Sequence, residues 1–186
     1  MKQARKILIA VVVVSAITIS SVFAKPSDFK NAVGFYSLNG LNLDSAYGLQ
    51  YHRWCTDKIG FQTQGYINYY DQGSYSNPLN YSISVQILYK LFEMDIGERA
   101  GSCLYAWASA GHHGYIDRKV VYPEDETLTE QVTDTVCLNA QVGLGFGIDI
   151  MCLEHISLPI EFGYMGEFPS NTVIGFVFGS GIRYRF

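Results

Sequence analysis

The chain has 186 residues and a formal net charge of −4, and only 16% of its residues are charged, below the roughly 25% of soluble domains. Aromatic residues make up 15%, with 14 Tyr among them. The acidic balance argues against nucleic acid and against an anionic membrane surface as partners. An excess of tyrosine is typical of proteins placed at a lipid–water boundary, where an apolar ring with a polar tip is favoured.

The first 24 residues predict a secretory signal peptide. Residues 2–6 carry three basic side chains, and no charged residue follows until Lys25. A run from Ile7 to Ile19 is apolar, and small residues lead up to Ala24, after which we expect cleavage. The alternative is an anchoring helix, which needs about 20 apolar residues. Residues 25–186 then form one domain, with ten basic residues against 17 acidic ones.

Two segments alternate strictly between apolar and polar side chains. From Asn80 to Leu91, the odd positions are all apolar or aromatic, and the even positions are polar except for Leu88. From Val136 to Asp149, the even positions are apolar, and the odd ones carry Gly, Asn, Gln, Cys or Asp. Both segments exceed the roughly 9–11 residues that a tilted strand needs to cross a bilayer. They therefore predict strands with one greasy face and one polar face.

Six further strands complete the pattern. They are expected at Ala32–Leu38, Ser45–Trp54, Ile59–Tyr69, Gly101–Gly111, Ile156–Glu167 and Ile174–Phe186. The faces of Gly101–Gly111 cannot be assigned, because apolar residues occupy both parities. No run after the signal is long enough for a transmembrane helix, so a membrane-spanning chain must close its strands into a barrel. The fold class predicted is a closed antiparallel eight-stranded transmembrane β-barrel, and a soluble periplasmic barrel is the alternative.

The last strand carries a recognisable motif. Gly181, Tyr184 and Phe186 match the assembly signal of bacterial outer-membrane β-barrels, although Gly179 stands where a polar residue is usual. The chain thus resembles the small outer-membrane barrels of the OmpA, OmpX and OmpW type. That resemblance implies an integral protein of the outer membrane, surrounded by its lipid and inserted from the periplasm by the barrel-assembly machinery. It also implies a largely filled lumen, with any specific activity in the surface loops.

Connection lengths suggest an orientation. With both termini periplasmic, most of the longer connections face outward. The longest is expected at residues 113–134, which carry six acidic residues against Arg118 and Lys119. This loop is a candidate site for a host or other extracellular ligand.

Charges on the inner face are the first candidates for function. Six of them are expected to point into the lumen: Lys90, Asp149, Glu161, Glu167, Arg183 and Arg185. We expect the two arginines to meet the two glutamates in an ionic network that plugs the lumen, because an eight-stranded barrel is just wide enough for its side chains. A proton or ion path is the alternative use of the same residues.

Two pairs of residues have a spacing that could support catalysis or metal binding. His155 and Ser157 have the His-x-Ser spacing of outer-membrane lipid A deacylases, but Leu158 stands where that family has Asn. His112 and His113 would point to opposite faces of a strand, which disfavours a shared metal. No cofactor is indicated. The leading hypothesis is a structural or surface-interaction protein, such as an adhesin or surface antigen; the alternatives are a narrow channel for ions or small apolar molecules and a lipid A-modifying enzyme.

Four cysteines remain, at positions 55, 103, 137 and 152. Export implies an oxidising compartment, in which an even number of cysteines can pair. We expect a bridge between Cys103 and Cys152, because both should lie near the periplasmic rim on neighbouring strands.

Overall fold

The computed structural model describes residues 29–40, 43–68, 80–96, 99–121, 131–169 and 172–186. The predicted signal peptide lies outside these residues. Within the described residues, no helix is long and apolar enough to cross a membrane. The strands are β1 (Asn31–Gly40), β2 (Leu43–Trp54), β3 (Ile59–Asn68), β4 (Asn80–Asp95), β5 (Gly101–Val121), β6 (Gln131–Cys152), β7 (Ile156–Phe168) and β8 (Val173–Arg185).

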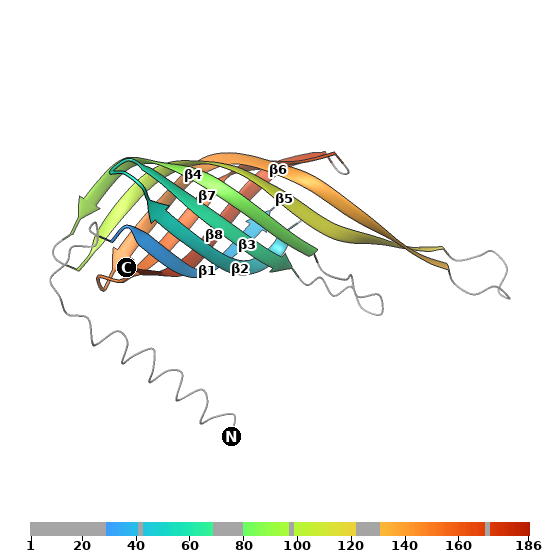
Figure 1. Ribbon diagram of the computed structural model, residues 1–186, viewed down its shortest axis with the longest axis horizontal. Helices are drawn as coiled ribbons and strands as arrows, with labels where there is room; N and C mark the ends of the chain where they lie inside the picture. The colour runs from blue at the N-terminus through green and yellow to red at the C-terminus, as the bar shows by residue number, and fades with distance from the viewer. Residues whose placement is uncertain (1–28, 41–42, 69–79, 97–98, 122–130, 170–171) are drawn as a thin grey trace, which may run out of the picture.

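The strands form one closed antiparallel barrel in chain order (Figure 1). Closure is made between β1 and β8, which pair continuously from Ala32 opposite Arg185 to Gly40 opposite Val177. Backbone hydrogen bonds between Asn31 and Phe186 extend this seam to the last residue. A closed sheet satisfies every backbone group within the wall, which a lipid environment demands. The predicted fold class is confirmed.

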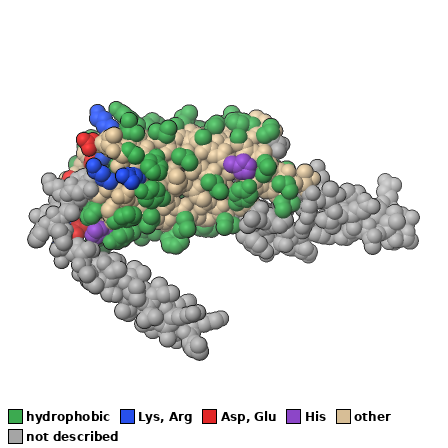
Figure 2. Space-filling model, in the orientation of Figure 1, with side chains coloured by type: hydrophobic (Ala, Val, Ile, Leu, Met, Phe, Trp, Pro, Cys, Tyr) green, Lys and Arg blue, Asp and Glu red, His purple; other side chains and the backbone are tan. Residues whose placement is uncertain are grey.

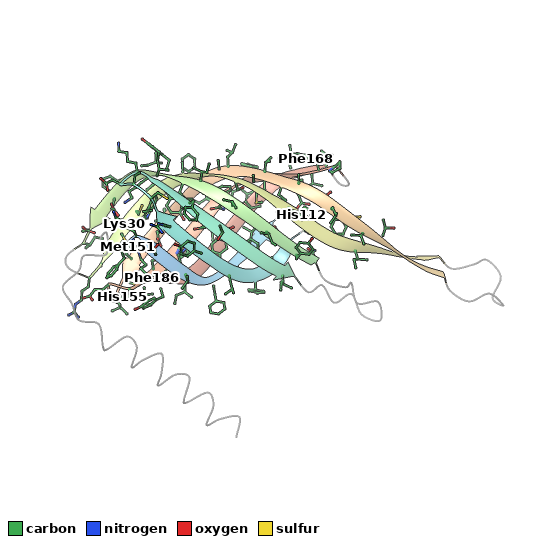
Figure 3. All side chains as sticks on the ribbon, viewed as in Figure 1. Lys30, His112, Met151, His155, Phe168 and Phe186 are labelled. Atoms are coloured by element: carbon green, nitrogen blue, oxygen red, sulfur yellow. The ribbon has the colours of Figure 1, made fainter. Side chains whose placement is uncertain are left out.

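The distribution of side chains is the inverse of that in a soluble domain. Outward positions carry large apolar residues, and Phe35, Leu144 and Ile174 are 70%, 67% and 74% exposed. Figure 2 shows hydrophobic side chains spread over the barrel wall, with charged side chains gathered at the end that carries the termini. Figure 3 shows the same side chains projecting from the ribbon. A water-soluble protein rarely exposes so continuous an apolar surface, so this wall is built to face hydrocarbon.

The structure also assigns the faces of β5. Its odd residues face the lumen, and Cys103, Tyr105 and Trp107 are buried there. Its even residues, among them Leu104 and Ala106, face outward. Small outward residues and large inward aromatics explain why the sequence pattern left this strand ambiguous. The bulky groups are those that fill the barrel.

The expectation of a loop at residues 113–134 was wrong for most of that range. β5 and β6 continue to pair from Tyr115 opposite Cys137 to Val121 opposite Gln131. β4 pairs with β5 only as far as Gly114, and β7 pairs with β6 only as far as Ala140. The two strands therefore run on as a long hairpin beyond their neighbours (Figure 1). Backbone pairing between Val- and Thr-rich segments favours strand over loop here.

The two ends of the barrel differ. The end that carries Asn31 and Phe186, here called the terminal end, has the short connections after β2, β4 and β6. The opposite loop end carries the β5–β6 hairpin. β4 reaches further toward the terminal end than expected, since a bulge between Lys90 and Phe92 lets it pair on to Asp95. The connection after β4 is correspondingly shorter than the sequence suggested.

Candidate functional site: the filled lumen

Inward-facing glycines make room for the aromatic residues that fill the lumen. A Cβ atom placed on Gly145 or Gly163 would lie 2.6 or 2.7 Å from the ring of Trp107. A Cβ on Gly147 would overlap the ring of Tyr105. The run of alternate glycines in β6 is therefore a cradle for two large side chains of β5. Such close packing restricts the Tyr105 and Trp107 rings to a single orientation across the lumen.

Glu161 on β7 lies at the centre of the lumen and is 2% exposed. Tyr105 donates a hydrogen bond to its Oε1 at 2.7 Å, and Gln62 donates to the same oxygen at 3.0 Å. Tyr36 donates to Oε2. The Arg183 guanidinium lies 3.4 Å from Oε1. A carboxylate surrounded by donors on several strands holds the wall together from within, because a buried charge is tolerated only when it is paired and hydrogen-bonded.

Arg183 extends from β8 across the lumen. Its Nη2 donates to Gln50 Oε1 at 2.9 Å, and its Nη1 lies 3.4 Å from Asp149 Oδ2. The position opposite Arg183 on β1 is Gly34, which has no side chain to obstruct this path. Of the predicted pairings, the structure thus brings Arg183 to Glu161 and adds Asp149 as a second carboxylate.

Glu167 meets neither of the two arginines predicted to pair with it, Arg183 and Arg185. It lies toward the loop end, where His113 Nδ1 is 3.0 Å from both of its carboxylate oxygens. Gln141 Nε2 donates to it at 2.6 Å, and His113 Nε2 lies 2.6 Å from Asn80 Oδ1. This second polar cluster joins β4, β5, β6 and β7 where the hairpin leaves the barrel. The sequence placed His113 at the start of a loop, and its inward direction was not predicted, because the faces of β5 could not be assigned from the parity of its residues.

The remaining predicted lumen charges lie near the terminal end. Lys90 pairs with Glu93 at 2.7 Å, and its ammonium lies 4.7 Å from the ring centre of Trp54. Arg185 donates to the carbonyl of Phe29 at 2.9 Å. The six predicted charges thus do not form one network: only Arg183, Asp149 and Glu161 are joined by ion pairs, and the other three have separate partners.

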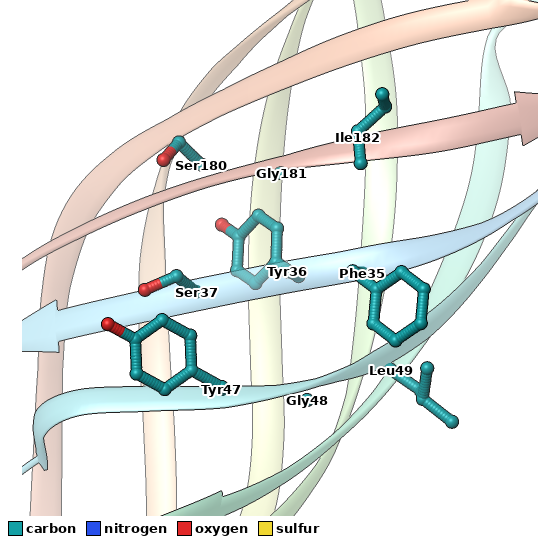
Figure 4. Close-up of a pocket in the computed structure, with 9 residues that line it drawn as sticks. All are labelled: Phe35, Tyr36, Ser37, Tyr47, Gly48, Leu49, Ser180, Gly181 and Ile182. Carbon is teal, nitrogen blue, oxygen red and sulfur yellow. The ribbon is translucent and has the colours of Figure 1, made fainter. Parts of the chain in front are cut away.

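The outer wall carries a shallow groove over β8, β1 and β2, with a volume of about 450 Å³. Phe35, Leu49 and Ile182 border it on the outward face, and the small side chains of Ser37 and Ser180 lie at its other end (Figure 4). Its lining is almost entirely apolar. In a membrane, such a groove is a surface for hydrocarbon rather than for a polar ligand.

The architecture matches solved outer-membrane barrels. The chain aligns with the N-terminal β-barrel domain of Pseudomonas aeruginosa OprF at a TM-score of 0.52 and 14% identity, covering 85% of this chain and 99% of that one. The chain has the fold of the small outer-membrane β-barrels. Weaker similarities reach Neisserial surface protein A, NspA (TM-score 0.45, 16% identity, 85% of this chain and 97% of that one), and Ail, the attachment invasion locus protein of Yersinia pestis (TM-score 0.41, 11% identity, 84% and 97%). No family model matches, and no curated protein is significantly similar in sequence.

In this outer-membrane barrel fold, the motif residues of the last strand lie on the seam. Tyr184 and Phe186 face outward and are 40% and 50% exposed. Gly181 faces inward against the ring of Tyr36, and an added Cβ would lie 3.0 Å from that ring. A side chain at Gly181 would therefore crowd the lumen beside the closing strand pair.

The spacing that suggested a deacylase does not assemble a catalytic pair. His155 lies in the turn after β6, stacks on the Tyr184 ring at 5.2 Å and places Nδ1 2.9 Å from the Arg185 carbonyl. Ser157 points into the lumen and is fully buried. A hydroxyl nucleophile needs its base within hydrogen-bond reach. The two side chains lie on opposite sides of the wall.

His112 and His113 likewise point apart. His112 stacks on Tyr81, with ring centres 5.9 Å apart, whereas His113 is in the lumen. Among the described residues, no group of three His, Cys, Asp or Glu side chains is arranged to hold a metal ion.

The bridge expected between Cys103 and Cys152 is not formed, and all four cysteines are free thiols. Cys103 is buried in the lumen opposite Asp149, while Cys152 has even parity on β6 and therefore faces outward. Thiols on opposite faces of a sheet cannot approach each other without distorting the backbone. The sequence placed both cysteines at the correct height along their strands, but it did not reveal that Cys103 lies on the inward face of β5.

Proposed function

We propose that this protein is an integral outer-membrane barrel with a closed lumen, and that it acts at the cell surface through the β5–β6 hairpin. The observation that carries the proposal is the length of this hairpin beyond the strands on either side. A role as adhesin or surface antigen fits this geometry better than transport or catalysis does.

The outer-membrane location is supported by the apolar outward wall. Outward residues of β6 are apolar at every even position from Val136 to Ile150. On the outward face, Tyr164 of β7 and Phe176 of β8 form an edge-to-face pair with ring centres 5.8 Å apart. Lipid is the natural solvent for this surface, and the proposed route to it is export followed by insertion by the barrel-assembly machinery.

The lumen contents support a non-conducting barrel. Tyr105 and Leu88 are completely buried within it, and Trp107 and Met165 are 5% and 6% exposed. The Glu161 carboxylate at its centre is held by Tyr105, Gln62 and Arg183 rather than left to line a path. A narrow channel would require these side chains to move together, which close packing opposes.

The hairpin supports a surface role through its shape. From Tyr115 to Val121 it extends roughly 24 Å past Gly114, the last residue of β5 that pairs with β4, at about 3.4 Å per strand residue. Beyond the barrel, each strand has one edge without a neighbouring strand among the described residues. The connecting sequence 122–130 contains Glu124, Asp125, Glu126 and Glu130. An acidic connecting sequence between two paired strands suits a basic host or extracellular partner.

Shortening the hairpin in register tests the proposal. Asp117 lies opposite Thr135, so residues 118–134 can be replaced by an Asn-Gly turn without changing the pairing below. We expect the variant to keep its heat-modifiable gel mobility and to lose adherence of expressing cells to host cells or extracellular matrix. The matched control replaces Leu153 and Glu154, at the terminal end, with Asn-Gly. Equal adherence of both variants would contradict a surface role for the hairpin.

A further inference from the structure

The terminal half of the lumen contains buried polar atoms that have no partner. Six side chains are involved, each at most 3% exposed. In each, one nitrogen or oxygen lacks a hydrogen bond within the described part of the chain: Gln50 Nε2, His52 Nε2, Asp149 Oδ1, Ser157 Oγ, Arg183 Nε and Arg185 Nη1. An unsatisfied buried polar group is costly, so six of them in one half of a barrel indicate something to be bound there.

These atoms belong to one neighbourhood. Arg183 contacts Gln50 at 2.9 Å and both His52 and Asp149 at 3.4 Å. Ser157 is its direct cross-strand partner on β7. Opposed residues of neighbouring strands have Cβ atoms about 5 Å apart, so the serine hydroxyl lies beside the root of the arginine side chain.

Arg185 adds a second guanidinium to the same place. It lies two residues after Arg183 on β8 and therefore on the same face. Ala32 on β1 is its cross-strand partner, and His52 lies beyond Ala32 on β2. Because Ala32 and Gly34 have small or no side chains, the side chains of Arg183, Arg185 and His52 share the part of the lumen next to β1.

The chemistry of the free atoms favours an anion over water. Arg183 Nε, Arg185 Nη1 and Gln50 Nε2 can only donate hydrogen bonds, and Ser157 can donate one. Asp149 Oδ1 is the single free carboxylate oxygen among them. Ser157 Oγ can also accept a hydrogen bond, and His52 Nε2 donates or accepts according to the ring tautomer. A water oxygen accepts at most two hydrogen bonds, whereas a halide can accept from all three donor-only atoms at once.

Charge favours the same conclusion. Arg183 has Asp149 and Glu161 within ion-pair distance. Arg185 forms no ion pair with any carboxylate that the structure describes, and its Nη2 is bound by the neutral carbonyl of Phe29. A buried guanidinium without a carboxylate at ion-pair distance is costly, and an inorganic anion beside Arg185 would supply that direct partner.

We propose that the terminal half of the lumen binds a small monovalent anion of halide size, held between Arg183 Nε and Arg185 Nη1 with Ser157 Oγ as a third donor. The anion gives the Arg185 guanidinium a direct counter-charge and links β7 to β8 beside the closing seam. Asp149 Oδ1 limits the site to one negative charge, because a divalent anion would be repelled more strongly. This assignment is independent of the hairpin and its role.

Trp54 provides a reporter for the site. Its ring lies 5.0 Å from that of His52 in an edge-to-face arrangement. The chain has two tryptophans, so Trp107→Phe leaves Trp54 as the sole one. Iodide is both a halide and a fluorescence quencher. We expect iodide to quench Trp54 in the refolded barrel along a saturable curve, and chloride to compete while sulfate at equal ionic strength does not.

Variants then locate the anion. Arg185→Gln in this background should weaken iodide binding about tenfold to a hundredfold, the value of one charge-assisted hydrogen bond. Ser157→Ala should weaken it by a smaller factor, about two- to tenfold. Arg53→Gln, a neighbouring but outward-facing arginine, is the matched control and should leave the curve unchanged. Heat-modifiable mobility shows that each variant has folded.

Linear quenching that is the same in Arg185→Gln and Arg53→Gln would overturn the proposal and leave only water at these donors. Saturable binding that survives both Arg185→Gln and Ser157→Ala would overturn it as well, since the halide would then lie elsewhere. If Arg185→Gln does not fold, Ser157→Ala decides between these outcomes.

Discussion

Replacing Glu161 with glutamine removes the charge at the centre of the lumen with almost no change in volume. The carboxylate accepts hydrogen bonds from Tyr105 and Gln62 and faces Arg183 at 3.4 Å, all within the buried lumen. Removing one partner of a buried ion pair costs about 3–5 kcal/mol, since the other charge is left uncompensated. Because Asp149 also contacts Arg183, we expect the lower end of that range.

Urea unfolding of the refolded barrel in lipid vesicles, followed by tryptophan fluorescence, measures this free energy. Glu93→Gln is the matched control, because its pair with Lys90 lies at the rim, where the Glu93 side chain is 25% exposed. That change should cost at most about 1 kcal/mol. The double variant Glu161→Gln with Arg183→Gln should recover part of the loss, since both charges are then gone. Equal costs for the two single variants, or strict additivity in the double variant, would refute the inference that Glu161 anchors the lumen through Arg183.

Three further outcomes are expected. Gly147→Val should destabilise the barrel by about 1–3 kcal/mol in the same assay, because the valine side chain would overlap the Tyr105 ring. Gly65→Ala is the control and should change stability little, since Gly65 lies on the outward face with open space around it. Leu153→Asn should stabilise the turn after β6 by roughly 1 kcal/mol, because Leu153 has a φ of 51° in the left-handed region; an unchanged or lower melting temperature would contradict this. In planar bilayers, the purified barrel should give no sustained conductance, and regular single-channel steps would refute a closed lumen.

Where alternation was strict, the sequence alone was enough to predict the strands. The polar inward face of β4 and the glycine-rich inward face of β6 follow directly from the parity of their residues, and eight such segments require closure. The pairing of charged residues in the lumen was predicted only in part. Arg183 and Glu161 were expected to meet because β7 and β8 are neighbours, and they do. Glu167 instead pairs with His113, which lies two strands away on β5, so this contact depends on the register of β5, β6 and β7 together.

The sequence by itself determined that this chain builds a closed barrel with an apolar exterior, because a period of two places every second side chain on the lipid-facing wall. It could not reveal where pairing stops, so residues 113–134, which include most of the hairpin, were predicted to be a loop. Nor could it assign the faces of β5, because this strand has alanines on its outward face and aromatic residues on its inward face. For that reason the sequence pattern predicted a Cys103–Cys152 bridge, which the structure does not contain. Only the tertiary structure decided these points, since register across neighbouring strands and the space inside the barrel are properties of all eight strands at once.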